Sequence, residues 1–224
     1  MFMMAHHFLW TYPKNSHMLA CRFKICEVYS RGEPLWKWIK KIQAMKAKKI
    51  IWDHSLDSPE TEIFVISVDG VDCRIWEKKH PTKPRDTALC SKKFNHGAVK
   101  YELALSVFRP KLVWMNGPFV ASKHDPKIFR EDGLKDKLQP GKIVIADKGY
   151  KADDLAHMVY IPNAIDDKDL KNFKSRVRCR HETFNGRIKH FSCLSETFRH
   201  GMDKHKIVFE AVCVIVQYLS LIHI

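Results

Sequence analysis

Two short apolar runs, each ending in an aspartate with a glycine one or two positions later, constrain the fold of this 224-residue chain more than any other feature. They are EIFVISVDG (62–70) and GKIVIADKGY (141–150). Runs this short and this apolar are typical of strands buried on both faces, which occur in sheets covered by helices. The chain therefore favours an α/β fold over an all-α or all-β fold.

The segments around these runs extend the strand-and-helix pattern. Further strands are expected at 71–77, 100–108, 111–119 and 160–164, a short helix at 124–131, a long helix from about Asp166 and a closing helix at 203–218. Strands first, then strand–helix alternation and closing helices, describe a mixed sheet flanked by helices, for which we expect five strands.

A polar stretch, SLDSPETE (55–62), has the composition of a linker. It divides the chain into a helical segment (1–50), a linker (51–61) and a domain at 62–218. Helices are expected at Met3–Trp10, Asn15–Phe23 and Pro34–Met45.

The third of these helices carries apolar residues at helical spacing and a face that contains Lys37, Lys40 and Lys41. A partial helix-turn-helix that contacts DNA through these lysines fits this pattern. A basic helix with a solvated lysine face fits it equally well.

The formal net charge of +14 favours a polyanionic partner such as duplex DNA, with an anionic membrane as the competing partner. The most apolar stretch (207–222) contains Glu210 and Gln217 and is short for a bilayer span, so we expect a buried helix and no membrane partner. The first ten residues lack the features of a signal peptide. We expect the protein in the nucleus of a eukaryotic host, and otherwise in the cytoplasm.

A third candidate carboxylate, Glu182, lies on the long helix. At about 100° per residue, Arg178, Glu182, Asn185 and Lys189 form a polar stripe about 120° from the apolar stripe that docks the helix on the sheet. Glu182 could simply pair with Arg178, which would contribute a few tenths of a kcal/mol.

That alternative leaves Gly186 unexplained. Glycine costs about 1 kcal/mol against alanine inside a helix. We interpret it as a place where another backbone or a ligand comes close.

Asp69 and Asp147 end the two buried runs, and open α/β sheets bind ligands at the carboxyl ends of their strands. Either aspartate alone would suit a turn. Three carboxylates brought together repel one another unless divalent cations lie among them, and oxygen ligands suit Mg²⁺ or Mn²⁺. We predict Asp69, Asp147 and Glu182 as catalytic ligands of two such ions, with Arg178 and Lys189 contacting the DNA backbone.

Two neighbouring groups are interpreted more simply. Asp125 lies at a helix start, where it would act as a cap, with a direct metal role as the alternative. His181 is expected to be packed rather than catalytic.

VDG with Asp69, ADKGY with Asp147 and HETFNGRIKHF with Glu182 together resemble the DDE transposase superfamily, specifically its PIF/Harbinger and IS5-like branch. The 34 residues between Asp147 and Glu182 are typical of such enzymes. Most of a Y-x2-R-x3-E-x6-K signature is matched from Arg178 to Lys189, with Ser175 at the tyrosine position. The resemblance covers roughly residues 60–218, including SKHDPKIF.

The resemblance implies an RNase H-like catalytic domain and an enzyme that cuts transposon ends and joins them to target DNA. It implies two Mg²⁺ or Mn²⁺ ions and a homo-oligomeric active complex, and it allows an accessory DNA-binding protein. A domesticated or decayed copy that binds DNA without cutting it is the alternative. An RNase H-like ribonuclease acting on RNA–DNA hybrids is a third possibility.

The last six residues, LSLIHI (219–224), follow the closing helix without a polar tail or cap. They are the translation of CTG TCT CTT ATA CAC ATC, an adapter end used in tagmentation sequencing libraries. We therefore expect a non-native tail at 219–224.

Overall fold

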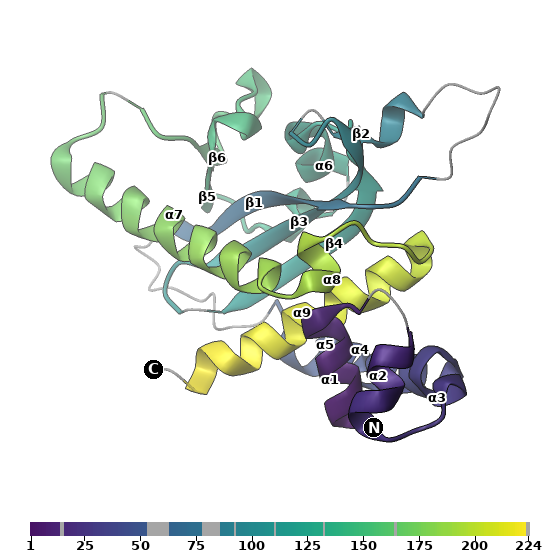
Figure 1. Cartoon of the computed structure of the whole chain (residues 1–224). Coiled ribbons are helices and arrows are strands. Elements are labelled where there is room, and N and C mark those ends of the chain that lie inside the picture. Colours follow the sequence, from purple (N-terminus) through teal and green to yellow (C-terminus); the bar gives the residue numbers. More distant parts are fainter. Residues whose placement is uncertain are drawn as a thin grey trace.

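The computed structural model describes residues 1–13, 16–52, 63–77, 86–91, 93–109, 111–131, 133–163 and 165–222. A mixed sheet lies at the centre, with helices on both of its faces (Figure 1). This arrangement confirms the expected α/β class and agrees with an RNase H-like fold.

In the described part of the chain, the sheet has six strands in the order β2-β3-β1-β5-β6, and β4 also pairs with β3. The strands are β1 (Phe64–Arg74), β2 (Cys90–Ser91), β3 (His96–Ser106), β4 (Leu112–Val120), β5 (Ile143–Ala146) and β6 (Val159–Tyr160). β1 is antiparallel to β3 and parallel to β5. Since five strands were expected, the addition is the two-residue edge strand β2.

The expected separate strand at 71–77 is wrong. β1 continues through Asp69 and Gly70, which stay paired with Leu103 and Glu102 of β3. The Asp-Gly pair forms no turn here because the long antiparallel ladder holds it extended.

Residues of β1 alternate between two hydrophobic cores. Ile66 and Val68 pack in the core that contains Phe129 of α6 (Asp125–Glu131). Val71 and Cys73 pack in the core that contains helices α7 (Lys168–Lys189), α8 (Ser192–Ser195) and α9 (Met202–Ile222). Because side chains alternate along a strand, Asp69 projects toward α7 and Gly70 faces α6.

Among the described residues, three N-terminal helices contribute buried residues to the second of these cores: α1 (Phe2–Thr11), α2 (Ser16–Phe23) and α4 (Glu33–Ala44). The short helix α3 (Glu27–Arg31) contacts α2 and α4, and α5 (Lys46–Lys49) contacts α9. α4 contacts α9 and α1 contacts α8, so the helical segment shares its core with the sheet domain. Most of the expected linker lies outside the described residues.

Helix α9 continues four residues beyond its predicted end, to Ile222. This extension does not test whether 219–224 is a non-native tail. Within the described ranges, no helix combines the length and apolar character that a membrane span requires.

Candidate active site

A pocket of about 80 Å³ opens where β1, β5 and α7 meet. It is lined by Ser67, Val68, Asp69, Ile145, Ala146, Asp147, Arg178, His181 and Glu182. In the parallel β1–β5 pair, Val68 lies opposite Ala146, so the residues that follow them, Asp69 and Asp147, reach the same level. The structure thus brings the three predicted carboxylates to one pocket.

Asp69 is held at both oxygens. The Gly70 N–H donates to its Oδ1 at 2.8 Å, and Asn185 Nδ2 donates to its Oδ2 at 2.8 Å. Burial raises the pKa of Asp69 to about 6, and the negative charges of Asp147 and Asp125 add to the rise. A buried aspartate close to other carboxylates therefore holds its proton more tightly than an exposed aspartate does.

Asp147 is exposed and follows β5 directly. Its Oδ1 accepts from the Gly149 N–H at 2.7 Å and caps the short 3-10 helix η4 (Lys148–Tyr150). A Cβ added to Gly149 would lie 2.9 Å from this oxygen, so the glycine leaves the space that the carboxylate needs.

Glu182 lies at the rim of the pocket, and its side chain is 70% exposed. Its ion pair with Arg178 is loose, at 3.9 Å, which corresponds to a few tenths of a kcal/mol. In this side-chain arrangement no group of three His, Cys, Asp or Glu residues within the described ranges is placed to hold an ion. Glu182 is the carboxylate with the freedom to turn toward the two aspartates.

One row of polar side chains on α7 contacts β1 at successive turns. His181 Nδ1 lies 2.9 Å from Ser67 Oγ, Asn185 binds Asp69, and Lys189 Nζ donates to the carbonyl of Asp72. We placed Asn185 in the polar stripe but did not predict its contact with Asp69. The spacing of four residues between 181, 185 and 189 is the signal that could have indicated it.

Lys189 does not line the pocket. Its ammonium also donates to the Leu194 carbonyl at 3.1 Å, so it ties α7 to β1 and α8. The predicted contact with DNA remains untested, and this geometry gives Lys189 a structural role.

His181 is buried, as expected, and burial lowers its pKa to about 3. It is therefore neutral near pH 7. Gly186 departs from expectation, because a Cβ added there would meet no atom of the described structure within 4 Å. The prediction that another backbone comes close to Gly186 is therefore wrong. That a ligand comes close there stays a prediction.

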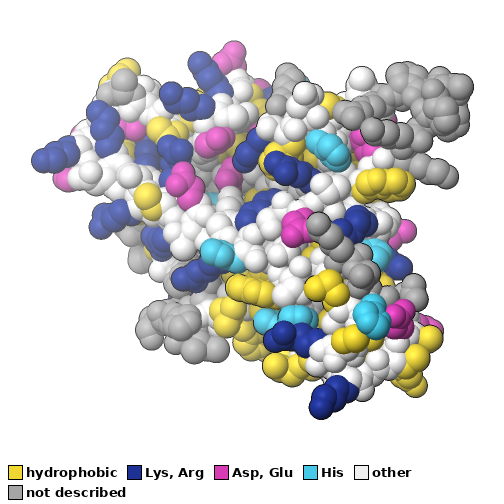
Figure 2. All heavy atoms as spheres, viewed as in Figure 1, with side chains coloured by type: hydrophobic (Ala, Val, Ile, Leu, Met, Phe, Trp, Pro, Cys, Tyr) yellow, Lys and Arg dark blue, Asp and Glu magenta, His cyan; other side chains and the backbone are white. Residues whose placement is uncertain are grey.

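The predicted DNA-binding cations lie on two surfaces. Arg178 is exposed beside the pocket. Figure 2 shows many Lys and Arg side chains over α7, where exposed cations that we did not single out include Lys168, Lys171, Arg176, Arg180 and Arg187. The exposed Lys37, Lys40 and Lys41 belong to α4, which lies beyond α9 from this corner (Figure 1).

A family model described as DDE superfamily endonuclease matches residues 68–217, a span that includes Asp69, Asp147 and Glu182. The chain belongs to the DDE superfamily endonucleases. No curated protein and no solved structure matches it. DDE superfamily endonucleases act on DNA and generally use divalent metal ions, so the predicted resemblance is confirmed at this level.

The pocket of this DDE superfamily endonuclease fits a divalent cation. Its donors are carboxylate oxygens, which suit Mg²⁺ and Mn²⁺. The carboxylates of Asp147 and Asp125 add negative charge near Asp69, and a cation would balance this charge. Asn185 Oδ1, beside Asp69, is buried and has no hydrogen-bond partner among the described residues.

Proposed function

We propose that this chain is a transposase-type nuclease and strand transferase. It would cut duplex DNA at the ends of a transposable element and join the cut ends to target DNA by phosphodiester hydrolysis and transesterification. Asp69, Asp147 and Glu182 would hold two Mg²⁺ or Mn²⁺ ions. The convergence of these three carboxylates on one pocket, from segments far apart in the sequence, carries the proposal.

The ions would supply activation of the attacking water or 3′-hydroxyl and stabilisation of the leaving oxygen. The chain's own residues prepare the site. Backbone and Asn185 donors fix the orientation of Asp69, and the Gly149 N–H fixes that of Asp147. Arg178, exposed at the rim, would pair with a phosphate of the bound strand.

Two exposed basic surfaces support a duplex substrate. The cations of α7 adjoin the pocket, where they would hold the strand to be cut. Lys37, Lys40 and Lys41 on α4 would contact phosphates elsewhere on the DNA. We further propose that the chain belongs to the PIF/Harbinger and IS5-like branch of the superfamily. Its active complex would be a homo-oligomer, with an accessory DNA-binding protein as a further partner. In a eukaryotic host the protein would be located in the nucleus.

Nicking of supercoiled plasmid DNA by the purified chain tests the proposal. We expect nicked circles with Mg²⁺ or Mn²⁺, none with EDTA, and none with folded Asp69→Asn. DNA binding without nicking in either ion would instead support the non-cleaving DNA-binding protein. Cleavage of an RNA–DNA hybrid but not of duplex DNA would support the ribonuclease.

A further inference from the structure

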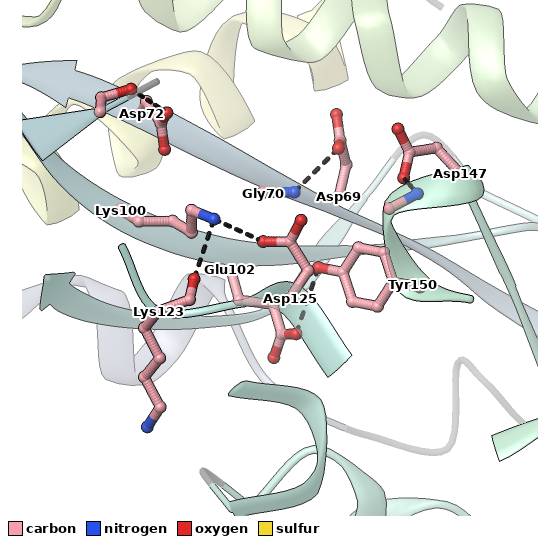
Figure 3. A network of polar contacts seen from close by, with 11 residues as sticks. Asp69, Gly70, Asp72, Lys100, Glu102, Lys123, Asp125, Asp147 and Tyr150 are labelled. Carbon is pink, nitrogen blue, oxygen red and sulfur yellow. Dashed lines mark hydrogen bonds and ion pairs between the residues drawn. The ribbon is translucent and has the colours of Figure 1, made fainter. Parts of the chain in front are cut away.

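Asp125, the first residue of α6, directs its carboxylate toward Gly70 in β1 and toward Gly149, which follows β5. Lys100 Nζ donates to Asp125 Oδ1 at 2.8 Å. Figure 3 shows Asp125 between Lys100 and Asp147, close to Gly70. The described contacts of this carboxylate are therefore with the sheet rather than with the backbone of its own helix, where a cap was expected.

Two glycines make room for Asp125. A Cβ on Gly70 would lie 3.1 Å from Asp125 Oδ1, and a Cβ on Gly149 would lie 3.1 Å from Asp125 Oδ2. The same Gly149 Cβ would lie 2.9 Å from Asp147 Oδ1. Oxygens of Asp125 and Asp147 therefore face one small space above Gly149.

Asp147 thus belongs to two groups of carboxylates. It lines the pocket with Asp69 and Glu182 on the α7 side of β1. It also faces Asp125, which approaches Gly70 from the α6 side. An aspartate that faces carboxylates on both sides is the arrangement that a pair of divalent ions would need.

The positive charge next to Asp125 comes from Lys100. Its ammonium also donates to the Lys123 carbonyl at 3.0 Å, and its side chain is 13% exposed. The ammonium pairs with Asp125, while Asp147 beside Asp125 and Asp69 beside Asp147 add two further carboxylates. A divalent cation balances such a group better than a single ammonium does.

We propose that Asp125 is a fourth carboxylate of the metal site, sharing a divalent cation with Asp147, and that Lys100 competes with this cation for Asp125. The inference rests on the proposed function, because it presumes that Asp69, Asp147 and Glu182 bind metal. It adds a ligand and a competitor on the other face of β1.

A purely structural ion pair between Lys100 and Asp125 makes different predictions. In that case, removing either partner would loosen α6 from β3 and lower the melting temperature by similar amounts. Affinity for metal would not change. The two roles therefore differ in how each substitution changes the affinity for metal. Only if Asp125 is a ligand does removing Asp125 lower this affinity while removing Lys100 raises it.

Calorimetric titration of the full chain with Mn²⁺ tests the proposal, with thermal melting alongside. Asp125→Asn should weaken binding of one Mn²⁺ ion at least about tenfold. Lys100→Gln should tighten it. Asp154→Asn is the matched control, because it breaks another ion pair to α6, with Arg130, outside the metal site.

Unchanged Mn²⁺ affinity in folded Asp125→Asn overturns the inference. If that variant does not fold, Lys100→Gln decides, and unchanged or weaker binding overturns it. Asp69→Asn separates this failure from failure of the proposed function. If Asp69→Asn loses Mn²⁺ binding and Asp125→Asn keeps it, only the role of Asp125 is rejected. If Asp69→Asn binds Mn²⁺ as the wild type does, or if the wild type does not bind Mn²⁺, both the role of Asp125 and the proposed function are rejected.

Discussion

Replacing Glu182 by glutamine separates a metal-binding role from a helix ion pair. Glutamine keeps the length and helix propensity of the side chain and removes its charge. Because Glu182 is 70% exposed and lies 3.9 Å from Arg178, the lost ion pair should cost less than about 0.5 kcal/mol of unfolding free energy. For a chain of this size, that corresponds to a melting-temperature change of about 1–2 °C.

Activity should respond far more strongly. Removing one group that stabilises the transition state typically costs about 10²-fold or more in rate, roughly 2.7 kcal/mol of barrier. The assay is single-turnover nicking of supercoiled plasmid in Mg²⁺ or Mn²⁺, with melting measured on the same preparation. Glu131→Gln is the matched control, since this exposed helical glutamate makes similarly loose pairs with Lys123 and Lys127 outside the pocket.

Full-rate, metal-dependent nicking by folded Glu182→Gln would remove Glu182 from the site. It would also remove the argument that the pocket is catalytic. If the argument holds, Asp69→Asn and Asp147→Asn should cause comparable losses. Combining two of these substitutions should add little, because residues that act as one unit are not additive.

Three further predictions concern positioning, stability and DNA contact. Asn185→Ala removes the donor to Asp69 Oδ2 and should slow nicking at least about tenfold with little change in melting; an unchanged rate would contradict the positioning role. Burial lowers the pKa of His205 from 6.5 to about 3, so the unfolded state takes up the proton at a higher pH than the folded state does. The contribution of His205 to the free energy of unfolding is therefore fully present above about pH 6.5 and is lost as the pH falls toward 3. His205→Gln should therefore reduce the dependence of the unfolding free energy on pH, between about pH 6 and 4, by up to about 1.4 kcal/mol per pH unit. Denaturant melts at several pH values measure this dependence, and the same pH dependence in the variant and the wild type would reject the role of His205. Replacing Lys37, Lys40 and Lys41 of α4 by alanine should weaken binding to all DNA duplexes alike and reduce the salt dependence of binding by about one counterion per lost contact. A loss of binding confined to one DNA sequence would instead indicate that the helix reads bases.

The sequence by itself determined the elements that carry the pocket. Apolar runs end at Asp69 and Asp147, and a strand buried on both faces needs such a run whatever surrounds it. The helical spacing around Glu182 likewise placed its carboxylate beside, rather than within, the buried stripe of α7. These are local patterns, so they could be predicted before any contact between elements was known.

Local preference failed where pairing between distant segments decided the outcome. Asp69-Gly70 has the composition of a turn, yet the ladder with β3 keeps it extended. Lys189 belongs to the polar stripe, but its long stem lets the ammonium reach the carbonyls of Asp72 and Leu194 instead of solvent. Both outcomes depend on partners far away in the sequence, β3 for Asp69-Gly70 and Asp72 for Lys189.

Only the tertiary structure decided which charges meet between Asp69 and Gly70 of β1 and the end of β5. Lys100 and Asp125 lie 25 residues apart, and Asp125 meets Asp147 only because α6 packs against the face of the sheet opposite α7. The same packing brings the carboxylates of Asp125 and Asp147 to the space beside Gly149 that a larger residue would fill. Side-chain charges act through space over several ångströms, so their balance depends on the packing of elements that the sequence specifies one at a time.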